Sequence, residues 1–73
     1  MNKQRVDSAV IKSVSLRLKQ LREAKGISQE TLYIDTDIHI ARIEAGKSNI
    51  TISTLSALCT YLDISLADFF EGI

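Results

Sequence analysis

The sequence predicts an all-α protein, a compact bundle of five short helices in a single domain. Apolar residues recur at steps of three and four, which places them on one face of an α-helix. No segment alternates between apolar and polar residues over a useful length, as a half-buried strand would. The 73 residues are 45% hydrophobic and 25% charged, with three glycines and no proline. Such a composition is typical of a globular domain.

The first helix is indicated by four apolar residues spaced by four, four and three positions. These are Val10, Val14, Leu18 and Leu21, which share one helical face. We expect the helix to end at Gly26, because glycine tolerates the left-handed conformation that often follows a helix C-terminus.

A short second helix is expected from Gln29. Ser28 offers a hydroxyl that can cap the helix N-terminus. Leu32 and Ile34 are expected to supply its core contacts. Residues 35–37, which read Asp-Thr-Asp, favour a turn or caps.

Two further helices follow. The third should bury Ile40 and Ile43, which lie three positions apart, and end before Gly46. Thr51 can cap a fourth. The apolar face of that fourth helix is expected to comprise Ile52, Leu55, Leu58, Cys59 and Leu62.

The last helix is predicted by a capping box, in which Ser65 is followed three positions later by Asp68. Phe69 and Phe70 are adjacent, so they cannot both face one core. We expect one to pack inward and the other to be exposed, which favours a homodimer through this helix. The alternative is that Phe70 packs against the chain end at Ile73.

The charges divide unevenly along a chain whose formal net charge is zero. Residues 1–25 hold seven basic and two acidic residues, whereas residues 26–73 hold two basic and seven acidic ones. This division is compatible with a basic face for nucleic acid. On charge alone, ordinary solvated helix faces that partly pair with each other are favoured, since a pI near 6.5 lacks the strongly basic character of many DNA-binding domains.

Several classes of function are disfavoured. No apolar run approaches the ~20 residues that span a bilayer, and Met1 is followed by polar residues rather than an apolar signal segment. One cysteine and one histidine form no metal-ligand set, and there is no glycine-rich phosphate loop or evident catalytic group. We therefore expect a cytoplasmic protein without membrane association, metal, cofactor or enzymatic activity.

Three blocks of sequence, in order, resemble the lambda-repressor-like helix-turn-helix family, also called the Cro/repressor or Xre type. The blocks are residues 18–32 (LKQLREAKGISQETL), 42–49 (RIEAGKSN) and 64–70 (ISLADFF). The resemblance covers roughly residues 10–70 and implies a five-helix lambda-repressor-like bundle. We expect the helix-turn-helix domain to span residues 8–73, after a flexible arm at residues 1–7.

The resemblance also implies which residues contact DNA. In this family the third helix lies in the major groove and the second crosses the backbone. Gln29 matches a position that typically bonds a phosphate, and Lys47, Ser48 and Asn49 match a loop that commonly contacts phosphates. The alternative for all four is an ordinary solvated surface.

Arg42 is the best candidate for reading a base, because arginine can bond guanine O6 and N7 together. Its alternative is an exposed arginine that pairs with a neighbouring acid. His39 can hydrogen-bond a base or a phosphate, or it can simply face solvent at the start of the helix.

A structural ion pair is implied between Arg22 and Glu44. A carboxylate in the last turn of a helix opposes the helix dipole and needs a cationic partner. The resemblance supplies one in Arg22 of the first helix, four positions before Gly26.

One departure from the family concerns the spacing between Gln29 and Glu44, which is about three residues shorter than usual. Either the first turn of the recognition helix is lost, or the second helix is trimmed and residues 37–39 form that turn. Base contacts therefore cannot be carried over to residues 36–41. The turn also lacks the usual glycine, although Asp37 can adopt a left-handed conformation.

The leading hypothesis is a sequence-specific transcriptional regulator that binds a palindromic operator in double-stranded DNA as a homodimer. The alternative is a protein-interaction or antitoxin-like module that keeps the helix-turn-helix scaffold and binds DNA weakly or not at all. Neutral net charge and the shortened motif favour that alternative.

Overall fold

The computed structural model describes residues 5–73, so residues 1–4 of the predicted arm lie outside the described residues. Over the described part the chain is all-helical, as predicted, and none of its helices is long and apolar enough to cross a bilayer. The helices are α1 (Ser8–Ala24), α2 (Gln29–Thr36), α3 (Ile40–Glu44), α4 (Ile52–Tyr61) and α5 (Leu66–Glu71).

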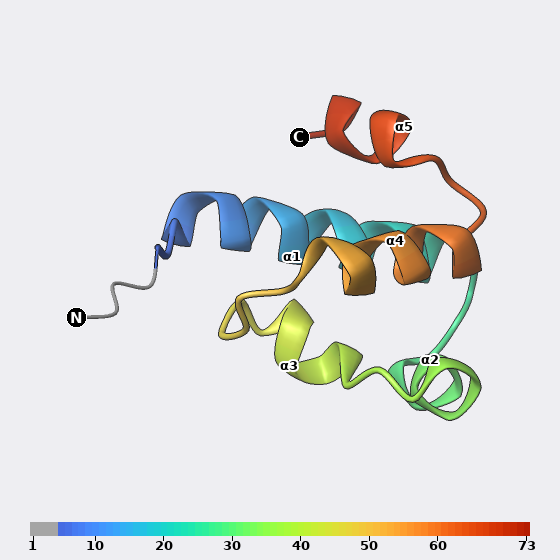
Figure 1. Ribbon diagram of the computed structural model, residues 1–73. Coiled ribbons are helices and arrows are strands. Elements are labelled where there is room, and N and C mark those ends of the chain that lie inside the picture. The colour runs from blue at the N-terminus through green and yellow to red at the C-terminus, as the bar shows by residue number, and fades with distance from the viewer. Residues whose placement is uncertain (1–4) are drawn as a thin grey trace.

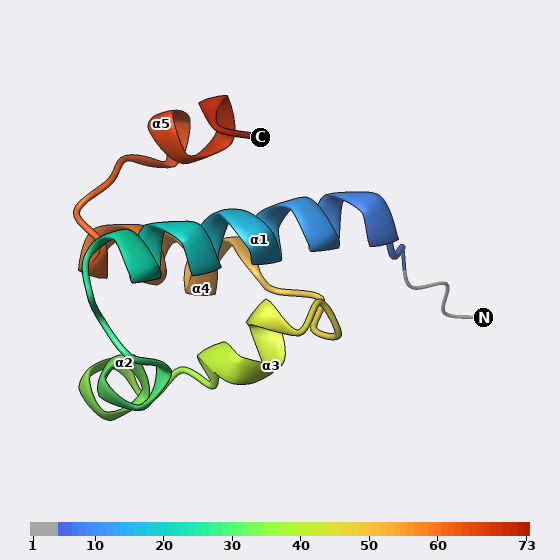
Figure 2. The ribbon, with the colours of Figure 1, turned by 180° about the vertical axis from the view of Figure 1, so that it is seen from behind.

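The longest helix, α1, runs through the middle of the molecule (Figure 1). In both the front and the rear view, α5 lies on one side of α1 while α2 and α3 lie on the opposite side (Figures 1 and 2). The helix-turn-helix pair and the C-terminal helix therefore occupy opposite sides of the bundle.

All five helices contribute to one hydrophobic core, in which Leu18, near the middle of α1, is fully buried. Burying such a side chain stabilises the fold by roughly 1.5–3 kcal/mol. The core residues are Val14, Leu18, Leu32, Ile40, Ile43, Leu55, Leu58, Cys59, Leu62 and Phe69.

The N-termini of α1, α2, α4 and α5 are capped by short polar side chains. The hydroxyls of Ser28, Thr51 and Ser65 each accept a hydrogen bond from the backbone N–H three positions later, which confirms the predicted starts of α2, α4 and α5. Asp7, the last residue of the predicted arm, caps α1 in the same way.

Gly26 ends α1 as the sequence predicted. Its φ is 68°, and the following Ile27 N–H donates to the carbonyl oxygen of Arg22 at 3.1 Å. This reversal brings the chain directly into α2.

Three apolar residues predicted to face the core are exposed instead, and these predictions were wrong. Ile34 and Ile52 are each 70% exposed, and Val10 is 51% exposed. Ile34 lies two positions from the buried Leu32, so at about 100° per residue it falls on the opposite face of α2. Val10 and Ile52 lie in the first turns of α1 and α4, at the margin of the core.

The C-terminal helix is held by Arg17 of α1. The Arg17 guanidinium donates to the carbonyl oxygens of Phe69 and Asp68, both at 3.3 Å, and lies 6.0 Å from the centre of the Phe69 ring. Phe69 is fully buried and Phe70 is 45% exposed, which confirms that one phenylalanine packs inward while the other does not.

The turn between α2 and α3 is built around Asp37. This residue ends α2 in the left-handed conformation, with φ 59° and ψ 21°, and so replaces the family's usual glycine. Thr36 supports the turn by accepting a hydrogen bond from the Ile38 N–H at 3.2 Å. Because α3 begins only at Ile40, residues 37–39 are a connection, and the hypothesis that they form the first helical turn was wrong.

The left-handed geometry predicts the order of stability of variants at position 37. A Cβ atom is disfavoured in this conformation, so we expect Asp37→Ala to be less stable than Asp37→Gly by about 1 kcal/mol. Urea denaturation followed by circular dichroism measures the difference. At the exposed helical position Gln20 the order should reverse, with alanine favoured by about 1 kcal/mol. If the alanine variant were more stable than the glycine variant at both positions, the left-handed conformation assigned to Asp37 would be contradicted.

Candidate nucleic-acid interface

The two faces of α3 differ sharply in burial. Ile40 is 1% exposed and Ile43 is 7% exposed, and both pack into the core. His39 and Arg42 are exposed. His39 is the N-cap residue just before α3 and Arg42 lies within the helix, and both side chains line the same two hollows described below. The core thus fixes the helix while leaving these two side chains free to contact a partner.

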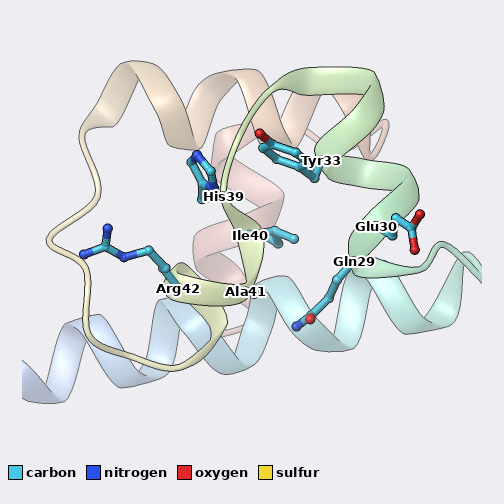
Figure 3. Close-up of a pocket in the computed structure, with 7 residues that line it drawn as sticks. All are labelled: Gln29, Glu30, Tyr33, His39, Ile40, Ala41 and Arg42. Carbon is cyan, nitrogen blue, oxygen red and sulfur yellow. The ribbon is translucent and has the colours of Figure 1, made fainter.

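A shallow hollow of about 260 Å³ separates α2 from this end of α3 (Figure 3). Arg42 extends from its edge, away from the side chains of α2 (Figure 3). The hollow is lined by Gln29, Glu30, Tyr33, His39, Ile40, Ala41 and Arg42.

A second hollow, of about 430 Å³, lies between α3 and the segment that leads into α4. His39 and Arg42 line both hollows and therefore form the ridge between them. The second hollow is lined by Asp37, Ile38, His39, Arg42, Ile43, Ser48, Asn49, Ile50, Thr51 and Thr54.

His39 is oriented by an aromatic contact that the sequence did not reveal. Its ring centre lies 4.8 Å from that of Tyr33 on α2, with the ring planes tilted by 36°. His39 occupies the N-cap position of α3, but its side chain makes no capping hydrogen bond. The Tyr33 ring thus holds the imidazole on the ridge.

The loop after α3 places its three candidate residues differently. Ser48 and Asn49 line the second hollow, together with His39 and Arg42, whereas Lys47 is exposed and lines neither hollow. Asn49 also donates its side-chain amide to the carbonyl oxygen of Arg5 at 3.4 Å. Four of the six candidate DNA contacts therefore surround one hollow.

The ion pair expected between Arg22 and Glu44 is present, and it is bidentate. Arg22 Nε lies 2.7 Å from Glu44 Oε2, and Arg22 Nη2 lies 2.9 Å from Oε1. The two side chains are only 10% and 3% exposed. Arg22 Nη1 also donates to the carbonyl oxygen of Ile27 at 2.7 Å. One guanidinium therefore joins α1, the start of the helix-turn-helix and the end of α3.

Gln29 takes part in the same cluster. Its side-chain Nε2 donates to Glu44 Oε1 at 2.9 Å, so the amide group implied to bond a phosphate is directed at a carboxylate within the protein. Gln29 therefore connects the first turn of α2 to the last turn of α3.

Ser15 provides a second link between α1 and α3 that sequence reasoning missed. Its Oγ lies 2.6 Å from the carbonyl oxygen of Ile43 and 2.7 Å from that of Ile11, and its single proton can be donated to either. A serine in the middle of a helix gives no signal of a partner 28 positions away.

The contacts of the Glu44 carboxyl group favour its charged form. Burial alone would raise its pKa, but hydrogen bonds from Arg22 and Gln29 and the nearby charges of Arg22 and Lys19 together lower the pKa below the ordinary 4.5. The hydrogen bond to Glu44 likewise raises the pKa of Arg22.

Comparison with known proteins gives one match. A family described as helix-turn-helix matches residues 18–69, which is more than half of the chain and includes all of α2, α3 and α4. No curated protein and no solved structure is significantly similar to the chain.

The buried ion pair predicts a pH-dependent loss of stability in Glu44→Gln. At pH 7 this variant leaves the Arg22 guanidinium without its carboxylate, and we expect it to be about 3 kcal/mol less stable than the parent. Because the folded-state pKa of Glu44 is lowered, the contribution of the pair is fully present above pH 4.5 and is lost as pH falls through the folded value. The difference between parent and variant should therefore narrow below pH 4.5.

Urea midpoints measured from pH 7 down to pH 3 test this. Glu23→Gln is the matched control, because it makes the same change at an exposed neighbour of Arg22 and should have little effect. A parent-to-variant difference that stays constant over the whole range would contradict the assignment.

Proposed function

Because the chain belongs to the Cro/repressor type of helix-turn-helix proteins, a family of DNA-binding regulators, we propose that it is a sequence-specific transcriptional regulator of double-stranded DNA. The observation that carries this proposal is the exposed ridge formed by His39 and Arg42 on a helix whose other face is anchored in the core. The recognition helix enters the major groove with its N-terminal end. Regulation follows from occupancy of the operator in the cytoplasm, without a chemical step.

Arg42 reads a base in this proposal, with guanine as its natural partner. Its alternative role, an ion pair with a neighbouring acid, finds no support, because Arg42 forms no ion pair with any of residues 5–73. His39, held by Tyr33 at the start of α3, is the second reading side chain.

The phosphate contacts come from both sides of the ridge. Lys47, Ser48 and Asn49 supply them after α3, and Gln29 supplies one at the start of α2. Since the Gln29 side-chain amide bonds Glu44, its backbone N–H in the first turn of α2 is the group available to a phosphate.

A homodimer is supported by an apolar patch around Phe70. Val10, Ile52 and Phe70 are all about half exposed or more, and they border a hollow of about 130 Å³ between α1 and α4. A patch that offers both a projecting ring and a hollow can complement itself across a two-fold axis. Ile73 is itself 50% exposed, which gives little support to the alternative that it covers Phe70.

Phe69, in contrast, is not part of the proposed interface. Its ring is fully buried beneath Arg17 within the protomer, so it is not available to a partner. Dimerisation through Phe70 would present two recognition helices to half-sites about one turn of DNA apart.

The second candidate is a protein-interaction module on the same scaffold. It is favoured by two acidic side chains at the ridge, Glu30 in the first hollow and Asp37 in the second, which oppose approach of the phosphate backbone. The recognition helix is also only five residues long. Selection from random duplex DNA separates the candidates, since a protein-only module would enrich no sequence.

Selected duplexes then test the role of Arg42. We expect Arg42→Ala to lower affinity for the selected operator by about 1–3 kcal/mol while changing affinity for scrambled duplex little, because the base contact exists only in the specific complex. Lys47→Ala is the matched control and should weaken both complexes about equally. Fluorescence anisotropy measures both affinities. An unchanged preference for the operator in Arg42→Ala would remove its reading role.

The dimer proposal predicts that Phe70→Ser shifts the protein toward monomer, because it removes the projecting apolar ring. Leu16→Ser is the control, since Leu16 is a 56% exposed apolar residue outside the patch. Sedimentation equilibrium of parent, variant and control measures the shift. A monomeric parent, or a Phe70→Ser protein as dimeric as the parent, would refute an interface at Phe70.

A further inference from the structure

We propose that Lys12 and Lys19 of α1 bind DNA phosphates beside the end of α3, which extends the DNA-binding surface onto a helix outside the helix-turn-helix. This inference rests on the proposed function. It assigns to the phosphate backbone two residues that the resemblance did not implicate.

The two lysines belong to a row on one face of α1. Lys12, Ser15, Lys19 and Arg22 follow each other at steps of three, four and three, so their side chains lie along the same side of the helix. Ser15 bonds the carbonyl oxygen of Ile43, and Arg22 pairs with Glu44. This row therefore lies against the last turn of α3.

Lys12 lies beside the loop that follows α3. The side chain of Lys12 lies next to Gly46, where the loop begins. A Cβ atom at position 46 would be 3.8 Å from Lys12 Cγ and 4.0 Å from Ser15 Oγ. The exposed Lys47 is the next residue of that loop. Lys12 thus continues the phosphate-contacting edge already proposed for the loop.

Lys19 lies one step before Arg22 in the row, near Glu44 and hence near the side chain of Gln29. Its positive charge contributes to the lowered pKa of Glu44, and Gln29 donates to the same carboxylate. Seven residues, or about 10.5 Å along the axis, separate Lys19 from Lys12. The two ammonium groups can therefore reach separate phosphates.

Neither lysine is held in direct contact by the protein's own acids. Glu44 already accepts three hydrogen bonds from Arg22 and Gln29, and neither Lys12 nor Lys19 forms an ion pair within residues 5–73. Both side chains are exposed. An exposed cation without a partner next to the recognition helix is suited to an external anion.

Two of the acidic residues lie away from the lysine row. Asp68 and Glu71 lie on α5, on the opposite side of α1 from α2 and α3 (Figures 1 and 2). On the side of α2 and α3, Glu44 is already paired with Arg22, whereas Glu30 and Asp37 line the two hollows and oppose the phosphate backbone there. Lys12 and Lys19 add positive charge on the adjoining face of α1.

The test compares Lys12→Gln, Lys19→Gln and the double variant with Lys12→Arg and Lys19→Arg, which keep the charge. Affinity for the selected operator and for scrambled duplex is titrated across a salt series. Each lost phosphate contact should make the negative slope of log affinity against log salt shallower by about 0.9, or by about 1.8 for a dimer that loses one contact from each protomer. The double Gln variant should show twice the loss of either single variant. The Gln variants should lose affinity for the operator and for scrambled duplex by the same factor. The Arg variants should retain the salt slope of the parent.

Thermal midpoints of the same proteins separate this role from a structural one. We expect Lys12→Gln to melt with the parent and Lys19→Gln to melt only slightly lower, because the charge of Lys19 near Glu44 is exposed to solvent. A lowered thermal midpoint with an unchanged salt slope would overturn the inference. It would mean that the lysines only balance the negative charge of Glu44 and the negative C-terminal end of the α3 dipole. An unchanged slope in the double variant, with a parent that binds its operator, overturns the inference but leaves the proposed function standing. A parent whose affinity for every duplex is negligible overturns both.

Discussion

The position of the recognition helix depends on the carboxylate of Glu44. Its two oxygens bind Arg22 of α1 and Gln29 of α2, so three helices meet at one charged group that is almost completely buried. Breaking such a pair leaves a charge without compensation in a poorly solvated site, which costs far more than losing an exposed ion pair. The hydrogen bond from Ser15 of α1 to the carbonyl oxygen of Ile43, the residue before Glu44, attaches α3 to α1 at a second point. A helix of five residues is too short to be stable alone, so α3 keeps its geometry through these contacts and the burial of Ile40 and Ile43.

Much of the fold could be predicted because its determinants are local. The caps at Ser28, Thr51 and Ser65 act on N–H groups three positions away, and Gly26 acts on the preceding turn. The errors had two causes. Ile52 is as apolar as Leu55 and lies three positions before it on α4, so no local rule shows that it lies at the margin of the core. Ile34 lies two positions from Leu32, and helical geometry already places it on the opposite face of α2.

The candidate site was predictable in part. The ion pair between Arg22 and Glu44 followed from the family resemblance together with the electrostatic need of a carboxylate at a helix end. The bond from Gln29 to that carboxylate and the contact of Tyr33 with His39 did not follow, because each depends on how α2 is set against α3. That setting is determined by the short connection around Asp37, whose left-handed conformation the sequence only permitted.

The division of α3 into an anchored face and a free face bears on how such a protein diverges. Stability resides in Ile40, Ile43 and Glu44, whereas His39 and Arg42 contribute exposed side chains that the core does not constrain. Substitutions at the free positions therefore leave the free energy of unfolding nearly unchanged. Under the proposed function, duplicated copies of such a chain can acquire new target sequences by single steps, each of which passes through a folded protein.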